Sequence, residues 1–460
     1  MRPIPESVAK TFYIETFGCQ MNVHDSEKVR GLLEQRGYSR VKSADEAGLV
    51  LYNTCSIRDK AERKVFARLS QIKRRSAGKT VGVLGCVAQH NGAEIFDRAP
   101  HVDFVCGSAS YNDLPDILDR VEAGESGVAG LDLDTHETFD VPRVDRVRPY
   151  SAYITIIEGC DKACTYCVVP FTRGPERSRS SASVMREAAH LQALGYTEIT
   201  LLGQTVNSYS DPSPAGWSFA RLLDEIGRLP RIRRVRFTTS HPSDFTPGIV
   251  EAIDRNEFLC DWVHLPVQSG STSVLRAMRR TYSRGDYMRC VEMIKAASRR
   301  IELSTDIIVG FPGETESDFQ QTLGLLNEVE YASVFSFKYS PRKGTVAAGM
   351  PQIPEAVKGR RLIELQQRQR EIQIRRNAEL IGRTEEVLVE GWRERFGQWI
   401  GRTTQNRVLN FADPEGLAMG RDLRGTYCQA RVTTAGPNSL VGELASPSAR
   451  AAFQGLRVLQ

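Results

Sequence analysis

The chain carries Cys160-Asp-Lys-Ala-Cys164-Thr-Tyr-Cys167 directly after a strand-like run, Tyr153-Ile-Thr-Ile-Ile157. Three thiolates at Cys-x3-Cys-x2-Cys spacing can hold three corners of a cubic [4Fe-4S] cluster and leave the fourth iron without a protein ligand. Such an open iron can bind a small molecule and pass it an electron. The alternatives are a zinc site or three thiols that bind no metal. Zinc sites usually close with four ligands, and no paired Cys or His element lies nearby, so the spacing favours the cluster.

Composition indicates a globular protein of more than one domain. At 460 residues the chain is long for a single hydrophobic core, and we expect roughly two to four domains. Hydrophobic residues at 41% and charged residues at 25% are typical of soluble proteins. The net charge of +5 does not by itself indicate a nucleic-acid partner. Two basic runs, Lys358 to Arg383 and Arg58 to Arg75, are equally compatible with solvated helix faces.

The sequence predicts a cytoplasmic location and no membrane partner. Its N-terminus lacks the apolar core of a secretion signal, and no stretch of about 18 apolar residues occurs. In a reducing compartment, ten cysteines favour metal binding or catalysis over a disulfide framework.

The first segment, residues 1–145, alternates apolar runs with helix-like stretches and is typical of a parallel sheet covered by helices. Three strand-like runs lead straight into a cysteine: Thr16-Phe-Gly-Cys19, Asn53-Thr-Cys55 and Leu84-Gly-Cys86. The carboxyl ends of parallel strands share one edge of the sheet, so these three cysteines should converge. We interpret Cys19, Cys55 and Cys86 as ligands of a second Fe–S cluster, with three buried core cysteines as the alternative.

Two glycines and a fourth cysteine belong to the same pattern. Gly18 and Gly85 each precede a cysteine and would let the backbone come close to a bulky inorganic group. Cys106 also follows an apolar run. We assign it to the core, because three cysteine ligands keep one iron free for chemistry.

The second segment, residues 146–378, repeats strand and helix six times and predicts a partial parallel barrel. Strands are expected at 153–157, 198–202, 233–238, 261–265, 303–309 and 333–338, with helices at 182–194, 218–228, 247–256, 271–299 and 315–329. The active site of such a barrel lies at the carboxyl ends of its strands, so the Cys160–Cys167 loop should sit at the mouth. Candidates for ligand contacts there are Tyr166, Gln204, Ser240 and Gln268.

The third segment, residues 379–446, contains five short strand-like runs between turn residues and predicts a small β-barrel of the OB kind. Basic and aromatic residues interleave from Arg383 to Phe411, as in barrels that bind RNA with charged grooves and stacking rings. The alternative is a structural appendage, and residues 447–460 form a tail. The fold class is therefore α/β: an N-terminal parallel α/β domain, a central partial (βα)6 barrel and a C-terminal β-barrel.

Nearly the whole chain resembles the methylthiotransferase family of radical S-adenosylmethionine (SAM) enzymes, whose C-terminal part is a TRAM RNA-binding domain. The stretches that carry the resemblance are Thr16-Phe-Gly-Cys-Gln-Met-Asn22, Asn53-Thr-Cys-Ser-Ile-Arg58, Gly159 to Pro170, Thr172-Arg-Gly174, Leu201-Leu-Gly-Gln204, Leu265-Pro-Val-Gln-Ser-Gly270, Asp306 to Thr315, Lys338-Tyr-Ser-Pro-Arg342, Gly401 to Arg407 and Pro437 to Leu444.

The resemblance implies a tRNA methylthiotransferase that places sulfur and a methyl group at C2 of N6-isopentenyladenosine next to the anticodon. Its cofactors would be two [4Fe-4S] clusters, one on Cys19, Cys55 and Cys86 and one on Cys160, Cys164 and Cys167, with no further catalytic side chain. SAM would be both methyl donor and source of a 5′-deoxyadenosyl radical. Partners would be the tRNA anticodon stem-loop and an electron donor such as flavodoxin or ferredoxin.

The resemblance leaves some alternatives open. Thr205 stands where many relatives have Asn, which bears on a SAM or substrate contact. Sister branches act on N6-threonylcarbamoyladenosine in tRNA or on an aspartate of a ribosomal protein, whereas Gln20-Met21-Asn22 favours the isopentenyl branch. A non-enzyme alternative is an RNA-binding Fe–S sensor, which would release no 5′-deoxyadenosine from SAM.

Overall fold

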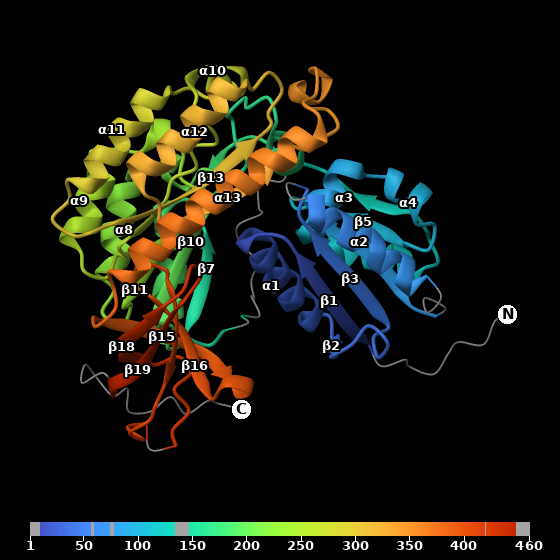
Figure 1. The fold of residues 1–460 in the computed structure, drawn as a ribbon. Helices are drawn as coiled ribbons and strands as arrows, with labels where there is room; N and C mark the ends of the chain where they lie inside the picture. Colours follow the sequence, from blue (N-terminus) through green and yellow to red (C-terminus); the bar gives the residue numbers. More distant parts are fainter. Residues whose placement is uncertain are drawn as a thin grey trace.

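The computed structural model describes residues 10–56, 59–73, 78–133, 146, 148–418 and 420–447, which form three units (Figure 1). Arg58, Arg74 and Arg75 of the shorter basic run lie outside the described residues, as does the predicted tail beyond residue 447. No helix in the described part of the chain is both long and apolar enough to cross a membrane.

The N-terminal unit is a parallel sheet with helices on both faces, as predicted. The strands, in the order β2-β1-β3-β4-β5-β6, are β1 (Thr11–Phe17), β2 (Ser39–Arg40), β3 (Leu49–Thr54), β4 (Thr80–Gly85), β5 (Phe104–Cys106) and β6 (Val128–Gly130). The helices are α1 (Gln20–Gln35), α2 (Asp59–Ile72), α3 (Cys86–Asn91), α4 (Glu94–Arg98), η1 (Tyr111–Asp113) and α5 (Leu114–Glu122). Separate hydrophobic clusters join α1 and α5 to one face of the sheet, and α2 and α4 to the other.

The central unit contains six parallel strands in two three-stranded sheets, ordered β11-β10-β7 and β12-β13-β14 and connected by a parallel bridge between Val235 and Leu259. The strands are β7 (Ser151–Thr155), β10 (Glu198–Leu202), β11 (Arg234–Phe237), β12 (Trp262–His264), β13 (Glu302–Val309) and β14 (Ser333–Lys338). The helices around them are α7 (Ser181–Ala193), α8 (Phe219–Gly227), α9 (Pro247–Arg255), α10 (Thr272–Ala277), α11 (Arg284–Lys295), α12 (Glu316–Val329) and α13 (Glu355–Ala378). The predicted partial (βα)6 barrel is confirmed.

Short elements complete the barrel, and one predicted helix is wrong. The short elements are β8 (Ile157–Glu158), α6 (Val169–Arg173), β9 (Arg177–Ser178), η2 (Val206–Ser208), η3 (Pro242–Asp244) and η4 (Val346–Gly349). The helix expected over 271–299 is divided into α10 and α11, because Arg279 has a left-handed φ of 54°. Ser283 and Asp286 then form a capping box that begins α11.

The C-terminal unit is a closed five-stranded barrel ordered β15-β16-β17-β19-β18, as predicted. Its elements are β15 (Thr384–Arg393), η5 (Glu394–Phe396), β16 (Gln398–Thr403), β17 (Val408–Ala412), β18 (Tyr427–Ala435) and β19 (Leu440–Pro447). Arg234 of β11, only 1% exposed, joins the two barrels by donating to the backbone oxygens of Arg402 (2.7 Å) and Glu386 (3.0 Å). Arg236 donates to the backbone oxygen of Thr403 (2.7 Å) in the same interface.

The basic run on α13 has a structural role. Arg361 pairs with Glu314 at 2.7 Å, and both side chains are buried. Arg376 pairs with Glu302 at 2.7 Å. These pairs fasten α13 along the outer side of the central barrel, where Figure 1 shows it in orange. The solvated-face alternative is therefore incomplete, because part of the run is buried against acidic partners.

Candidate functional site

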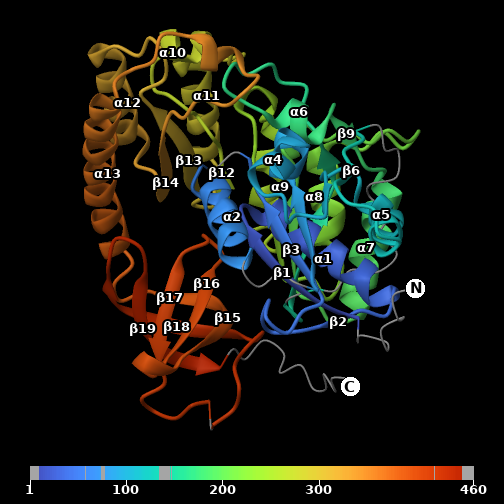
Figure 2. The same ribbon diagram turned by 90° about the vertical axis from the view of Figure 1, so that its right-hand side faces the viewer.

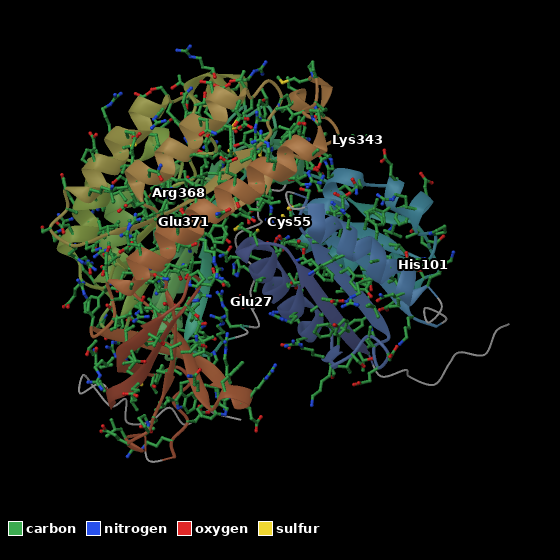
Figure 3. All side chains as sticks on the ribbon, in the orientation of Figure 1. Glu27, Cys55, His101, Lys343, Arg368 and Glu371 are labelled. Atoms are coloured by element: carbon green, nitrogen blue, oxygen red, sulfur yellow. The ribbon has the colours of Figure 1, made fainter. Side chains whose placement is uncertain are left out.

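Cys19, Cys55 and Cys86 converge at one edge of the N-terminal sheet. They follow β1, β3 and β4, which are neighbours in the sheet. The Cys19 and Cys55 side chains are hydrogen-bonded to each other, and Cys86 is close enough for its pKa to respond to Cys19. Figure 3 shows Cys55 on the side of the N-terminal unit that faces the central barrel. The convergence predicted from topology is confirmed.

Two asparagines hold the cysteine loops at this edge of the sheet in place. Asn22 on the first turn of α1 accepts a hydrogen bond from the Cys19 backbone N–H at 3.3 Å and lies 3.4 Å from the Cys19 sulfur. The Asn53 amide donates to the Asn22 backbone oxygen and to the Ser26 hydroxyl, both at 2.9 Å. Both asparagines are fully buried, so the cysteine loops rest on a satisfied polar network.

The glycines beside the cysteines make room for this network of asparagines. A Cβ on Gly18 would lie 2.3 Å from the Asn22 side-chain oxygen and 2.7 Å from the Cys55 Cβ. A Cβ on Gly85, where φ is 85°, would lie 2.4 Å from the Asn53 side-chain oxygen. The close packing of Asn22 and Asn53 therefore requires glycine at both positions, and the predicted approach of the backbone to an inorganic group stays a prediction.

The protonation tendencies of the three thiols differ. The hydrogen bond from Cys55 lowers the pKa of Cys19 to about 6, against the opposing effect of burial. Burial raises the pKa of Cys86, and the nearby Arg173 opposes that rise. Cys19 is therefore more ready than Cys86 to act as a thiolate ligand at neutral pH. Cys106, at the end of β5, is fully buried, and burial raises its pKa strongly, which agrees with a core role.

The residues around this triplet fit an additional bound group. Within the described residues, the Thr54 and Ser56 hydroxyls on either side of Cys55 are buried and have no hydrogen-bond partner. Buried polar atoms in folded proteins are nearly always satisfied. Two unsatisfied buried hydroxyls beside three convergent thiols therefore fit a site that holds an Fe–S cluster.

Cys160, Cys164 and Cys167 form the second triplet, in the loop between β8 and α6 at the mouth of the central barrel. The Thr165 backbone fastens the loop to the opposite side of the mouth, through Met278 (3.1 Å) and Ala347 (2.8 Å). Burial raises the pKa of Cys160 to about 11 and that of Cys167 to about 12, and Cys164 adds to both shifts. Metal binding here would therefore displace protons.

Arg280 is a contact of this triplet that the sequence did not indicate. It lies in the break between α10 and α11, and its guanidinium donates to the Cys164 sulfur at 3.3 Å and to the Tyr282 hydroxyl at 2.8 Å. The helix break thus places a cation against one of the three sulfurs.

Arg173 joins the two triplets. It lies on α6, six residues after Cys167, and its guanidinium pairs with Asp25 on α1; both side chains are buried. It also hydrogen-bonds to Cys86. Helix α3, which begins at Cys86, packs against α6, and Figure 2 shows α6 directly above the N-terminal helices. The Ser108 hydroxyl adds a 2.9 Å hydrogen bond to the Thr172 backbone oxygen. The two cysteine loops therefore lie at one shared interface.

We expect the substitution Arg173→Met to destabilise the N-terminal unit by about 3 kcal/mol, since it leaves the Asp25 carboxylate buried without its partner. The measurement is the first transition in urea denaturation. The matched control is Arg68→Met, which breaks a half-exposed pair with Glu15 (3.0 Å) in the same unit and should cost no more than about 1 kcal/mol. Equal shifts for both variants would contradict a buried bridging role for Arg173.

Two of the residues predicted to contact SAM have a buried polar atom without a hydrogen-bond partner among the described residues. In the described part of the chain, the Gln204 side-chain oxygen and the Ser240 hydroxyl are buried at the barrel mouth and lack a hydrogen-bond partner. They follow β10 and β11, the neighbouring strands of one sheet. Buried acceptors and donors without partners are costly unless a ligand satisfies them. Both residues therefore fit a polar ligand bound beside the Cys160–Cys167 loop.

The other two candidates differ in character. Gln268 has a left-handed φ of 71°, and its backbone hydrogen-bonds on both sides to β13, to Asp306 and to Ile308 (both 2.9 Å). Tyr166 packs edge-on against Phe311, with ring centroids 6.4 Å apart, which supports packing as part of its role. Thr205, the departure from the family pattern, donates to Glu176 at 2.7 Å and is buried, so it has a local partner.

Over the described ranges, no three His, Cys, Asp or Glu side chains are placed to hold a single metal ion. A cubane cluster does not need that arrangement, because each thiolate binds a different iron. Cys260 and Cys428 are buried, as expected for core residues, and Cys290 is partly buried.

Sequence reasoning missed Arg173 and Arg280 as contacts of the triplets. Arg173 was inside a quoted family motif, Thr172-Arg-Gly174, so its presence was visible without its partner. Arg280 had no comparable signal, because it lay inside a stretch that looked continuously helical. Its partner Cys164 is 116 residues away in the sequence.

Three family models match the chain. They are the uncharacterized protein family UPF0004 over residues 11–107, the radical SAM superfamily over residues 154–326, and the TRAM domain over residues 378–445. The first match contains Cys19, Cys55 and Cys86, and the second contains the Cys160–Cys167 loop.

Among solved structures, the fold resembles the radical SAM methyltransferase TsrM from Kitasatospora setae. The TM-score is 0.55 at 14% identity, and the match covers 74% of this chain and 77% of that one. At that identity the likeness concerns the fold alone.

Curated relatives match almost from end to end. A protein of Solibacter usitatus (strain Ellin6076) is 63% identical over 439 residues, covering 95% of this chain and 98% of the relative. A protein of Koribacter versatilis (strain Ellin345) is 55% identical with the same coverage. Both are named tRNA-2-methylthio-N(6)-dimethylallyladenosine synthase. At this identity and coverage, the chain belongs to the family of tRNA-2-methylthio-N(6)-dimethylallyladenosine synthases.

Proposed function

We propose that the chain is a radical SAM tRNA methylthiotransferase that places sulfur and a methyl group at C2 of N6-isopentenyladenosine next to the anticodon. The family supports the reaction and the tRNA substrate. The observation that carries the proposal is the meeting of two cysteine triplets at one interface, bridged by Arg173. An aromatic C–H bond has no acidic proton, so ordinary acid–base side chains cannot activate it, and the reaction needs cofactor chemistry.

The radical SAM family implies one [4Fe-4S] cluster and SAM. We assign that cluster to Cys160, Cys164 and Cys167, and SAM to the mouth beside Tyr166, Gln204, Ser240 and Gln268. We assign a second [4Fe-4S] cluster to Cys19, Cys55 and Cys86. When bound, these groups supply electron transfer, radical formation and the methylthio group, which no side chain can provide.

The chain's own residues hold and shield these groups. Arg280 sets a positive charge against Cys164, and Arg173 sets one against Cys86. Asn22 and Asn53 fix the loops that carry Cys19 and Cys55. Most of these groups are buried, which keeps water and oxidants away from reactive species. We infer that the protein contributes orientation and exclusion rather than proton transfer.

We assign tRNA binding to the C-terminal barrel, as its TRAM match supports. Trp392 is 48% exposed and Phe396 is 61% exposed, and both lie beside exposed arginines, Arg393 and Arg395. Charged grooves with stacking rings bind RNA without requiring paired bases. We further propose that a flavodoxin or ferredoxin supplies electrons in the cytoplasm, and that the domain division is 1–145, 146–378, 379–446 and a tail at 447–460.

Anaerobic reconstitution followed by nucleoside mass spectrometry tests the proposal. With SAM, a reductant and an anticodon stem-loop that carries isopentenyladenosine, we expect a 2-methylthio nucleoside and 5′-deoxyadenosine. A stem-loop with unmodified adenosine, one with threonylcarbamoyladenosine and a ribosomal-protein peptide are the controls. Modification of either alternative substrate in place of the isopentenyl loop would assign the chain to a sister activity. RNA binding should also weaken steeply with salt if phosphate contacts dominate.

A further inference from the structure

The inner face of strands β12 to β14 is lined by aromatic and polar side chains that no part of the site above uses. On β13, Leu303, Ile307 and Val309 pack into the main hydrophobic cluster, so the residues between them point to the opposite face. On β14, Val334 packs against that cluster, and Ser336 is bonded by Gln366 of α13. Residues 335 and 337 therefore point away from the helices, into the barrel.

The rings on this face form a continuous stripe. Trp262 and His264 of β12 are stacked with centroids 6.0 Å apart and planes 19° apart. His264 then meets Phe335 edge-on at 5.7 Å. Phe337 follows on the same side of β14. Phe335 is 49% exposed and Phe337 is 38% exposed, and both lie on β14, the terminal strand of the sheet β12-β13-β14. Large rings left this open on an inner face mark a binding surface.

Polar groups that can accept further hydrogen bonds lie beside the aromatic stripe. Asp306 is the register partner of Phe335, and its side chain is 32% exposed. It lies 3.5 Å from His264 Nε2, and His264 Nδ1 lies 2.9 Å from the Ser304 hydroxyl. A carboxylate offers up to four acceptor positions, so Asp306 can receive hydrogen bonds from amino groups of a ligand. Rings for stacking and acceptors for exocyclic amines are what unpaired nucleobases require.

The stripe connects the RNA-binding barrel to the cluster mouth. At its lower end, Asp261, next to Trp262, accepts hydrogen bonds at 3.2 Å from Thr404 and from Gln405 of the C-terminal barrel. At its upper end, Ile308 is the register partner of Phe337 and packs in the cluster that contains Tyr166. Figure 2 shows β12, β13 and β14 above the C-terminal barrel. RNA held by that barrel would therefore reach the mouth along this face.

We propose that Phe335 and Phe337, continued by Trp262, form a stacking platform for unpaired bases of the substrate RNA loop, with Asp306 as an acceptor for a base amino group. The proposal rests on the proposed function for the identity of the RNA. It adds the residues that lead the loop from the C-terminal barrel to the cysteine triplets. A ribosomal-protein peptide is the competing occupant, and the test separates the two.

The test uses the full-length reconstituted chain and an anticodon stem-loop with 2-aminopurine in the loop. Stacking on a ring quenches 2-aminopurine, and loss of one base–ring contact weakens single-strand binding roughly fivefold to a hundredfold. We expect the Phe335→Ala, Phe337→Ala double variant to bind at least about tenfold more weakly and to lose the protein-dependent quenching. Phe335→Tyr should retain both, whereas Phe335→Leu, apolar but without a ring, should lose the quenching.

The matched control is Ile363→Ala, an exposed apolar residue on α13. It should change neither binding nor quenching. Unchanged binding and quenching in the double variant, alongside methylthio product from the wild type, would overturn the platform and leave the proposed function standing. Ring-dependent quenching without methylthio product would retain the platform and overturn the proposed function. Ring-dependent capture of the peptide, with no RNA effect, would reject RNA as the occupant.

Discussion

Replacing Cys19 by alanine is expected to reduce the iron content from about eight to about four atoms per chain, because one of two cubane clusters loses a ligand. The methylthio product should fall by more than about a hundredfold, since even residues that only support metal ligands can cost that much. SAM cleavage to 5′-deoxyadenosine should continue, because the Cys160–Cys167 loop keeps all three thiols. Iron and sulfide counting, together with product analysis, measures all three quantities.

Cys106→Ala is the matched control for that variant. Cys106 ends β5, beside the strand that leads to Cys86, and is buried like Cys55 and Cys86, whereas Cys19 is partly buried. We assign it to the core, so its loss should leave both the iron content and the product unchanged. A fall in iron with Cys106→Ala but not with Cys19→Ala would show that the ligand set has been misassigned.

The architecture was predictable because hydrophobic periodicity matched the secondary structure almost everywhere. The runs expected at 198–202 and 333–338 are the observed β10 and β14. The error at 271–299 has a local cause: apolar spacing continues through the break, whereas Arg279 adopts a left-handed conformation that spacing does not encode. The length of the strands in the C-terminal barrel was also underestimated. Short strands were expected, whereas β15 runs over 10 residues, from Thr384 to Arg393, through a bulge near Val389.

Only the part of the candidate site that follows from the order and direction of the strands could be predicted from the sequence. Parallel strands bring their carboxyl ends to one edge, so Cys19, Cys55 and Cys86 could be placed together from three short runs. The cations could not be placed in this way. Arg173 and Asp25 are 148 residues apart in the sequence and meet only because α6 docks onto the N-terminal unit. Contacts between separately folded units depend on their packing, which a single sequence does not show.

The aromatic stripe on β12 to β14 could not be predicted from the sequence for a similar reason. The alternation in Ser333 to Lys338 predicts a strand, but a half-exposed Phe335 can be recognised only when the neighbours of β14 are known. Asp306 lies 3.5 Å from His264 of the stripe because β12 and β13 are adjacent. The order of the strands thus brings residues that are far apart in the sequence onto one continuous surface.

Replacing Cys164 by alanine should produce the opposite pattern to Cys19→Ala. SAM cleavage should stop, and methylthio product with it, because the loop retains only two of its three thiols and Arg280 loses its sulfur partner. About four irons should remain, on the N-terminal triplet. The assay is 5′-deoxyadenosine release under a chemical reductant, which needs no RNA and no sulfur transfer.

The control for Cys164→Ala is Cys290→Ala, on α11, whose partly buried thiol lies 3.5 Å from the Pro242 backbone oxygen and contacts neither triplet. That variant should cleave SAM at the wild-type rate. The pair of results distinguishes two clusters with separate tasks from one cluster shared by six thiols. If six cysteines held a single cluster, Cys19→Ala and Cys164→Ala would both abolish SAM cleavage. Retention of cleavage in the first variant and its loss in the second requires two sites, one on each side of Arg173.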